Sequence, residues 1–151
     1  MQSDHDFAVN QAGYTISAAL FRIGPDVLIV VTGGDHPHVG DVTTKSQHAP
    51  RQTVKFPSHD GRDHKDNFLS DRLADTVSSQ VGGSLTVLAG VHIDGITQAQ
   101  IKASAEIIDR LADQINQWLA AHPAHINPPT YYDQNHHPNR RGMAAQSVLI
   151  K

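Results

Sequence analysis

The 151-residue chain contains no cysteine, so disulfides, thiolate nucleophiles and sulfur-ligated metals are excluded. Any metal that it binds must take nitrogen and oxygen ligands. No apolar run approaches the ~18 residues needed to span a bilayer. The net charge is -3, from 12 Lys and Arg against 15 Asp and Glu, and the basic residues are dispersed apart from Arg140 and Arg141. These absences argue against a membrane-spanning protein and against nucleic-acid binding.

The length suits one hydrophobic core and is too short for two independent ones. We expect a single cofactor-binding domain over residues 1–122 and an irregular tail over residues 123–151, where Pro, Asn, Gln and His replace the apolar pattern. Residues 1–6 lack the start of a secretory signal and neither end carries a lipidation motif, so a cytoplasmic location is expected. Base rates for soluble oligomers favour a homodimer.

Strand signals dominate the first third of the chain. Residues 14–23 are rich in strand-forming types, and residues 27–32 form a continuous β-branched run typical of a strand buried on both faces. Turn residues at 24–26 predict that the two strands form a hairpin. Residues 39–44 predict a third strand, and residues 53–56 predict a short fourth segment that ends at a proline.

Two helices are expected further along the chain. Apolar residues within 65–81 follow helical spacing, and residues 85–93 predict a central strand. Thr97 and Gln100 form a capping box for a second helix that runs to about Ala121. Its apolar face comprises Ile101, Ala105, Ile108, Leu111, Ile115 and Leu119. The expected fold class is α/β (α+β), with one mainly antiparallel sheet, two covering helices and an irregular C-terminal tail, in the order β-β-β-(β)-α-β-α.

Histidine is abundant, with 11 in the chain, and four of them lie within residues 33–65 among aspartates and glycines. Imidazole and carboxylate groups on turns suit a divalent metal, a phosphate, or both. His36 and His38 would share one face of an extended strand, whereas the proline between them can bend them apart, so two solvated loop histidines are an equal alternative. His59 and His64 suit a loop that folds around an ion.

Other candidates are less specific. His92 lies near the carboxyl end of a predicted strand, where a lone histidine is more often a core residue than a ligand. Asp41 could orient a ligating imidazole through its second nitrogen, or could only fix a turn. Asp60 could act similarly, could serve with Asp63 and Asp66 as a general base, or could cap the helix that follows.

An anion could also bind near this stretch. Thr32, Gly33 and Gly34 follow a buried strand and offer backbone N–H groups to a phosphate, although glycines that only make a turn are the simpler interpretation. Arg62 and Lys65 place two cations beside the histidine loop. Neither a P-loop nor a dinucleotide-binding motif is present.

Three stretches, residues 30–44, 54–68 and 89–93, resemble the small D-subunit family of gallate-type decarboxylases, whose members are regarded as chaperones of prenylated flavin. The likeness extends from about residue 11 to residue 132, and includes residues 96–101 and the Tyr131–Tyr132 pair. Motifs of this length are far more specific than a single His-x-His.

The resemblance implies a non-catalytic helper that binds prenylated FMN with the assistance of a divalent metal and delivers it to a UbiD-type aromatic-acid decarboxylase. The positions that match the family pattern are His38, His59, His64 and His92 as metal ligands, with Asp41 in support, whereas His36 falls outside it. The metal could be Mn, Fe, Zn or Ni, because nitrogen and oxygen ligands distinguish these poorly. A flavin phosphate bridged by such a metal fits the residue types seen here.

Two alternatives from other classes stay open. One is a metal-dependent hydrolase or phosphatase that uses a metal-bound water, for which the sequence offers aspartates as bases but no dedicated glutamate. The other is a structural subunit permanently attached to a decarboxylase. A hydrolase would turn over phosphate esters, and a permanent subunit would co-purify with its enzyme.

Overall fold

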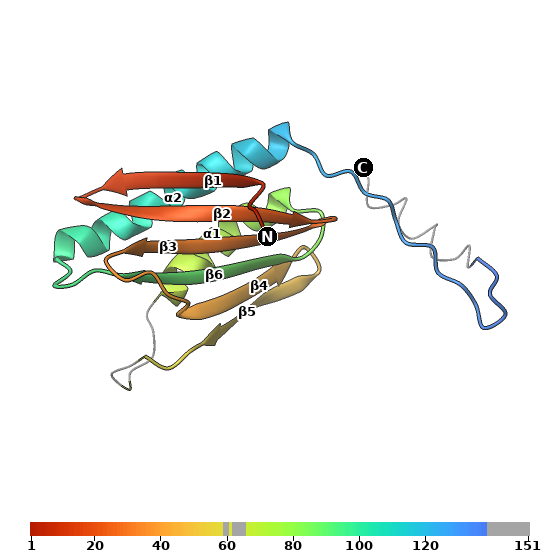
Figure 1. The fold of residues 1–151 in the computed structure, drawn as a ribbon, viewed down its shortest axis with the longest axis horizontal. Helices are drawn as coiled ribbons and strands as arrows, with labels where there is room; N and C mark the ends of the chain where they lie inside the picture. Colours follow the sequence, from red (N-terminus) through yellow and green to blue (C-terminus); the bar gives the residue numbers. More distant parts are fainter. Residues whose placement is uncertain (59–60, 62–65, 139–151) are drawn as a thin grey trace.

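The computed structural model describes residues 1–58, 61 and 66–138, which form a six-stranded mixed sheet with two α-helices (Figure 1). The strands lie in the order β1-β2-β3-β6-β4-β5. Along the chain the elements are β1 (His5–Gln11), β2 (Tyr14–Ile23), β3 (Asp26–Gly34), β4 (Asp41–Ser46), β5 (Ala49–Lys55), α1 (Asn67–Val77), the 3-10 turn η1 (Ser78–Gln80), β6 (Leu85–His92) and α2 (Gln98–Ala121).

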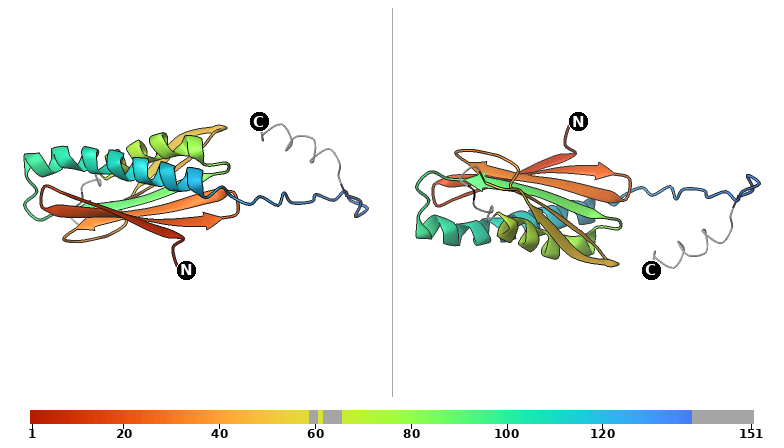
Figure 2. Two further views of the ribbon diagram at one scale, coloured as in Figure 1. Left: turned by 90° about the horizontal axis from the view of Figure 1, so that it is seen from above. Right: turned by 90° about the horizontal axis from the view of Figure 1, so that it is seen from below.

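Both helices cover the same face of the sheet (Figure 2). The core therefore lies between that face and the helices, where Ile16, Ile29, Leu73, Leu85 and Ile107 are fully buried. Along β3 every second side chain is buried and the intervening ones are half-buried. The expectation that residues 27–32 are buried on both faces is therefore wrong, because no helix of the described chain covers the other face.

The β2–β3 hairpin is confirmed, and the mainly antiparallel sheet has one parallel pair, β3 with β6. β1 was not predicted, because its sequence is mostly polar and only Phe7 and Val9 reach the core. β5 is longer than the predicted segment and includes Pro50, which is tolerated because β5 is an edge strand. In the described tail, residues 123–138 extend away from the domain with one bridge between Tyr132 and Pro138 (Figure 1).

The capping box of α2 is confirmed. The Gln100 N–H donates to Thr97 Oγ1 (3.2 Å), and the Thr97 N–H donates to Gln100 Oε1 (3.0 Å). The buried face of α2 begins at Ala103, whereas Ile101 is 46% exposed, so its predicted place in the apolar face is wrong. Ile101 belongs to the capped first turn, which precedes the packed part of the helix. No described helix is both long and apolar enough to cross a membrane.

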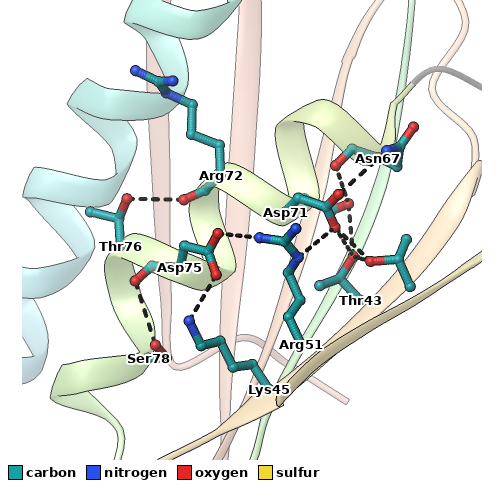
Figure 3. A network of polar contacts seen from close by, with 11 residues as sticks. Thr43, Lys45, Arg51, Asn67, Asp71, Arg72, Asp75, Thr76 and Ser78 are labelled. Atoms are coloured by element: carbon teal, nitrogen blue, oxygen red, sulfur yellow. Dashed lines mark hydrogen bonds and ion pairs between the residues drawn. The ribbon is translucent and has the colours of Figure 1, made fainter.

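A polar network fastens α1 to β4 and β5 (Figure 3). Thr43 is fully buried, and its Oγ1 lies 3.0 Å from Ser70 Oγ and 3.2 Å from Asp71 Oδ1. Arg51 forms ion pairs with Asp71 and Asp75 of α1. Because Ser70, Asp71 and Asp75 lie within α1, the network holds the body of the helix against β4 and β5.

We expect a Thr43→Val variant, which keeps the shape of the side chain, to lower the free energy of unfolding by about 1–3 kcal/mol. The reason is that Ser70 and Asp71 lose a buried hydrogen-bond partner. Chemical denaturation followed by circular dichroism measures the change. Thr130→Val, at an exposed position of the tail, is the matched control and should leave stability unchanged. Equal stability of the two variants would contradict a structural role for the network.

Candidate functional site

The candidate site lies at the edge of the sheet where β3 and β6 both end and β4 begins. In the parallel β3–β6 pair, Gly34 is in register with His92, so both carboxyl ends reach this edge. β6 lies between β3 and β4, so the connection over residues 35–40 must cross the end of β6. That crossing brings the histidines of the connection next to the end of β6.

Two glycines allow the crossing. A Cβ at Gly90 would lie 1.9 Å from the carbonyl oxygen of His38, and a Cβ at Gly34, where φ is +76°, would lie 2.1 Å from that of His92. The N–H groups of Asp35 and His36 donate to the His92 carbonyl at 2.7 and 3.3 Å. The connection is therefore held directly against β6, with no space for a side chain at either glycine.

His36 and His92 share one carboxylate. His36 Nε2 lies 3.0 Å from Asp94 Oδ2, His92 Nε2 lies 3.2 Å from Asp94 Oδ1, and the two ring centroids are 5.5 Å apart. The hydrogen bond with His36 is the largest influence that lowers the pKa of Asp94. The N–H of Asp94 in turn donates to Asp35 Oδ2 at 2.9 Å. All three side chains of the shared cluster are mostly exposed.

His38 pairs with a different carboxylate. Its Nε2 lies 3.3 Å from Asp66 Oδ2, and its Nδ1 lies 3.0 Å from the carbonyl oxygen of His36. Asp66 is the N-cap residue of α1, and its Oδ1 accepts a hydrogen bond from the N–H of Val91 at 3.2 Å. The Asp66 side chain is only 11% exposed. Asp66 therefore joins the start of α1, the end of β6 and the 35–40 connection.

Asp41 is the first residue of β4 and is completely buried. It is in register with Ala89 and Lys55, and lies on the same face of β4 as Thr43, two residues nearer the site. A buried carboxylate must be stabilised by hydrogen bonds or by opposite charge. Asp41 directly follows the 35–40 connection that carries His36 and His38, and its supporting role stays a prediction.

The other predicted site residues of this region, His59, Asp60, Arg62, His64 and Lys65, lie outside the described residues. The described residues that flank them are both at this edge. The N–H of Phe56 donates to the carbonyl oxygen of Gly40 at 2.8 Å, and Asp66 contacts His38. Phe56 and Asp66, on either side of these candidates in the sequence, therefore both lie beside the 35–40 connection.

Thr32, Gly33 and Gly34 lie within β3 and are paired with β6, and Thr32 and Gly33 are also paired with β2. They form neither the loop with free amides nor the simple turn that the sequence suggested. Gly33 also leaves no space for a side chain, because an added Cβ would lie 2.4 Å from the Thr15 carbonyl oxygen. Their contribution to phosphate binding stays a prediction.

Sequence reasoning set His36 aside and gave no supporting role to Asp66 or Asp94. The structure brings His36 to His92, at the same edge as the His38–Asp66 pair. The spacing of His92 and Asp94 was a usable signal, since a carboxylate two residues from a histidine at a strand end can reach its ring. Among residues 1–58, 61 and 66–138, no group of three or more histidine, aspartate or glutamate side chains is arranged so that it could hold a metal ion.

Comparison with known proteins assigns the family. Residues 10–120 match the family model described as a prenylated flavin chaperone LpdD-like domain. The chain is also 52% identical over 132 residues to Protein LpdD of Lactiplantibacillus plantarum, an alignment that covers 87% of this chain and 97% of that protein. Because the family model covers most of the described domain, including β3, β4, β6 and both helices, the chain belongs to the family of LpdD-like prenylated flavin chaperones.

Proposed function

We propose that this protein binds prenylated FMN reversibly at the edge formed by β3, β6 and the 35–40 connection, and delivers it intact to a UbiD-type decarboxylase. One observation supports this location for the flavin site. His36, His38 and His92 lie together with their carboxylate partners at the carboxyl ends of the parallel strands β3 and β6. Ligands of open α/β sheets commonly bind at such strand ends. The family description supports prenylated flavin as the cargo, and the clustered histidines support this edge as the proposed place of binding.

A divalent metal fits the chemistry of this edge. His38 Nδ1 donates to a backbone carbonyl, an arrangement that fixes the ring of a metal-ligating histidine and leaves Nε2 as the ligating atom. That Nε2 lies next to a carboxylate oxygen of Asp66, so two donor atoms are already adjacent. We propose that His38, His59, His64 and His92 hold Mn, Fe, Zn or Ni, with Asp66 and Asp41 in support.

When bound, the metal would supply positive charge for the cargo's phosphate. Residues of the chain itself position the site. Asp94 orients His36 and His92, and the N–H groups of Asp35 and His36 hold the 35–40 connection on β6. The contact between His36 and His92 makes His36 an additional candidate for cargo contact. Arg62 and Lys65 are proposed to contact the phosphate.

A reversible carrier is preferred over a hydrolase or a permanent subunit. Among the described carboxylates of this edge, Asp66 and Asp94 both hold imidazoles, and Asp35 accepts the N–H of Asp94. Each of the three is therefore already engaged, which argues against a separate base for an attacking water. Turnover of phosphate esters by the purified, metal-loaded protein would support the hydrolase instead. If the protein co-purified with a decarboxylase in a fixed stoichiometry, and if added flavin did not separate the two proteins, the permanent subunit would be supported.

We expect the affinity for prenylated FMN to fall by about 10–100-fold in a His38→Ala variant, because one proposed metal ligand is lost. A chelator should weaken binding by the wild-type protein to a similar level and have little further effect on the variant. Equilibrium titration followed by flavin fluorescence measures both. His48→Ala, at an exposed position of the β4–β5 turn, is the matched control and should bind like wild type.

Two outcomes would contradict the metal bridge: an affinity unchanged by chelator, or a His38→Ala variant that binds as tightly as His48→Ala. The melting profile of His38→Ala should stay close to that of wild type. A large loss of stability would show instead that His38 acts through its structural contact with Asp66.

A further inference from the structure

Exposed apolar side chains gather at the end of the domain that carries the candidate site. Single exposed apolar residues are normal on a protein surface, whereas a group of them in one place marks an interaction surface. Here the group comes from five segments that meet at this end. Its members are Val39 of the 35–40 connection, Phe56 after β5, Phe68 in the first turn of α1, Ile96 in the turn after β6, and Ile101 in the first turn of α2. We call these five residues the apolar rim.

Three members of the apolar rim lie on the β4–β5 side of the candidate site. The N–H of Phe56 donates to the carbonyl oxygen of Gly40 at 2.8 Å, so Phe56 adjoins the connection that carries Val39. Phe68 follows two residues after Asp66, whose Oδ1 accepts a backbone N–H at the end of β6 at 3.2 Å. The first turn of α1 is therefore held at the same strand end as the candidate site.

The other two members lie on the α2 side of the site. Ile96 follows Asp94 by two residues and directly precedes the N-cap of α2. Ile101 belongs to the first turn of that helix, and the Tyr14 hydroxyl donates to the neighbouring Gln100 carbonyl oxygen at 3.1 Å. Tyr14 is the first residue of β2, which begins where its antiparallel neighbour β3 ends. Both sides of the apolar rim therefore lie at one end of the sheet, with the candidate site between them.

The size of this end suits a short-lived complex with another protein. Six strands spaced about 4.8 Å apart, with a helix layer about 10 Å thick beside the sheet, give an end of roughly 29 Å by 20 Å. A partner that covered it would bury about 1,200 Å² in total, at the lower limit of specific interfaces, where transient complexes are found. A carrier that must release its partner after delivery needs an interface of this class.

We propose that the apolar rim is the docking surface for the flavin-free decarboxylase, which meets it with the entrance of its own flavin site. This inference rests on the delivery function proposed above. The rim lies on both sides of the cargo site, so a protein seated on it covers that site, and the acceptor of the cargo is the partner for which this is productive. A second copy of the chain or a regulator in the same place would block exchange of the flavin instead.

Docking of this kind encloses the cargo between two proteins. The apolar rim loses its water on contact, as the core of a protein interface does, while the mostly exposed polar cluster of His36, His92 and Asp94 stays between the partners. The flavin then moves from one site to the other without entering bulk water. Because the rim side chains are uncharged, they favour the apolar entrance of an enzyme over an acidic or basic macromolecule.

Phe68→Asp and Ile101→Asp test the two sides of the apolar rim in the full chain. Acidic residues are favourable in the first turn of a helix, so both variants should fold. Ile23→Asp is the matched control, because Ile23 is 54% exposed at the β2–β3 turn, at the opposite end of the sheet. Biolayer interferometry should show about tenfold or more weaker binding of the two rim variants to a flavin-free UbiD-type decarboxylase, since a charge in an interface loses its hydration. Equal affinity of all three variants would overturn the proposal.

Transfer kinetics separate this inference from the proposed function. Stopped-flow fluorescence follows prenylated FMN from the loaded protein to the decarboxylase, and dilution alone gives the rate of free release. The wild-type transfer rate should rise with decarboxylase concentration and exceed free release, whereas the rim variants, with unchanged flavin affinity, should transfer only at the rate of free release. Wild-type transfer at that rate at every decarboxylase concentration would overturn docking and leave the carrier function intact. A wild-type protein that binds no flavin would overturn the proposed function, and docking with it.

Discussion

A Gly90→Ala variant is expected to lose most of its flavin affinity. Its new Cβ would lie 1.9 Å from the carbonyl oxygen and 2.4 Å from the carbonyl carbon of His38, both of them backbone atoms that no rotamer change can move. The 35–40 connection must therefore shift off β6 and take His36 and His38 away from His92 and Asp66. Overpacking of this kind costs about 1–3 kcal/mol of stability. The loss of positioning should lower affinity for prenylated FMN by about tenfold or more.

Gly82→Ala is the matched control for this experiment. It introduces the same methyl group shortly before the same strand, where the nearest atom would be 3.9 Å away. Flavin titration and thermal melting of the two variants measure the difference. If Gly90→Ala binds flavin as well as Gly82→Ala does, the packing of the connection on β6 is not what positions the cargo site.

The second large effect is expected at Asp66. Replacement by alanine removes both the acceptor for the Val91 N–H and the carboxylate beside His38 Nε2. We expect about 1–3 kcal/mol of lost stability, from the part-buried donor left without its partner, and a 10–100-fold loss of metal-dependent flavin affinity. Asp66→Asn should separate the two effects. It keeps an oxygen for Val91 but removes the charge next to His38, so stability should recover while affinity should not.

Asp113→Asn tests whether the loss is specific, because it removes one negative charge from an exposed position of α2. Denaturant titration gives the stability of each variant and flavin fluorescence gives its affinity. An Asp66→Asn variant that binds as tightly as Asp113→Asn would show that Asp66 has only a structural role, as the acceptor for the Val91 N–H.

Local features of the fold could be predicted because neighbouring residues determine them. The capping box of α2 depends on Thr97 and Gln100, three residues apart, and the β2–β3 hairpin depends on a short turn between strand-forming runs. β1 escaped prediction because a mostly polar seven-residue strand becomes stable only through pairing with β2. The parallel β3–β6 pair was equally inaccessible, since about fifty residues separate its partners.

The candidate site could likewise be predicted in part from local sequence, while its long-range contacts could not. The residue types and the long motifs pointed to His38 and His92, and the family match agrees with the prenylated flavin chaperone that these motifs indicated. His36 became a candidate site residue only once the tertiary structure was known. Its contact with His92 exists because the 35–40 connection crosses the end of β6. Asp66 likewise gained a role only when the start of α1 was placed beside that strand end.

The sequence by itself determined the family, the nitrogen and oxygen chemistry of any metal site, and the helices and hairpin, because composition, motifs and short-range spacing contain that information. Only the tertiary structure decided which carboxylate accompanies which histidine and which face of the sheet is left open. Those features depend on strand order and on the side that the helices cover. Both are set by packing between segments far apart in the chain, to which local patterns are insensitive.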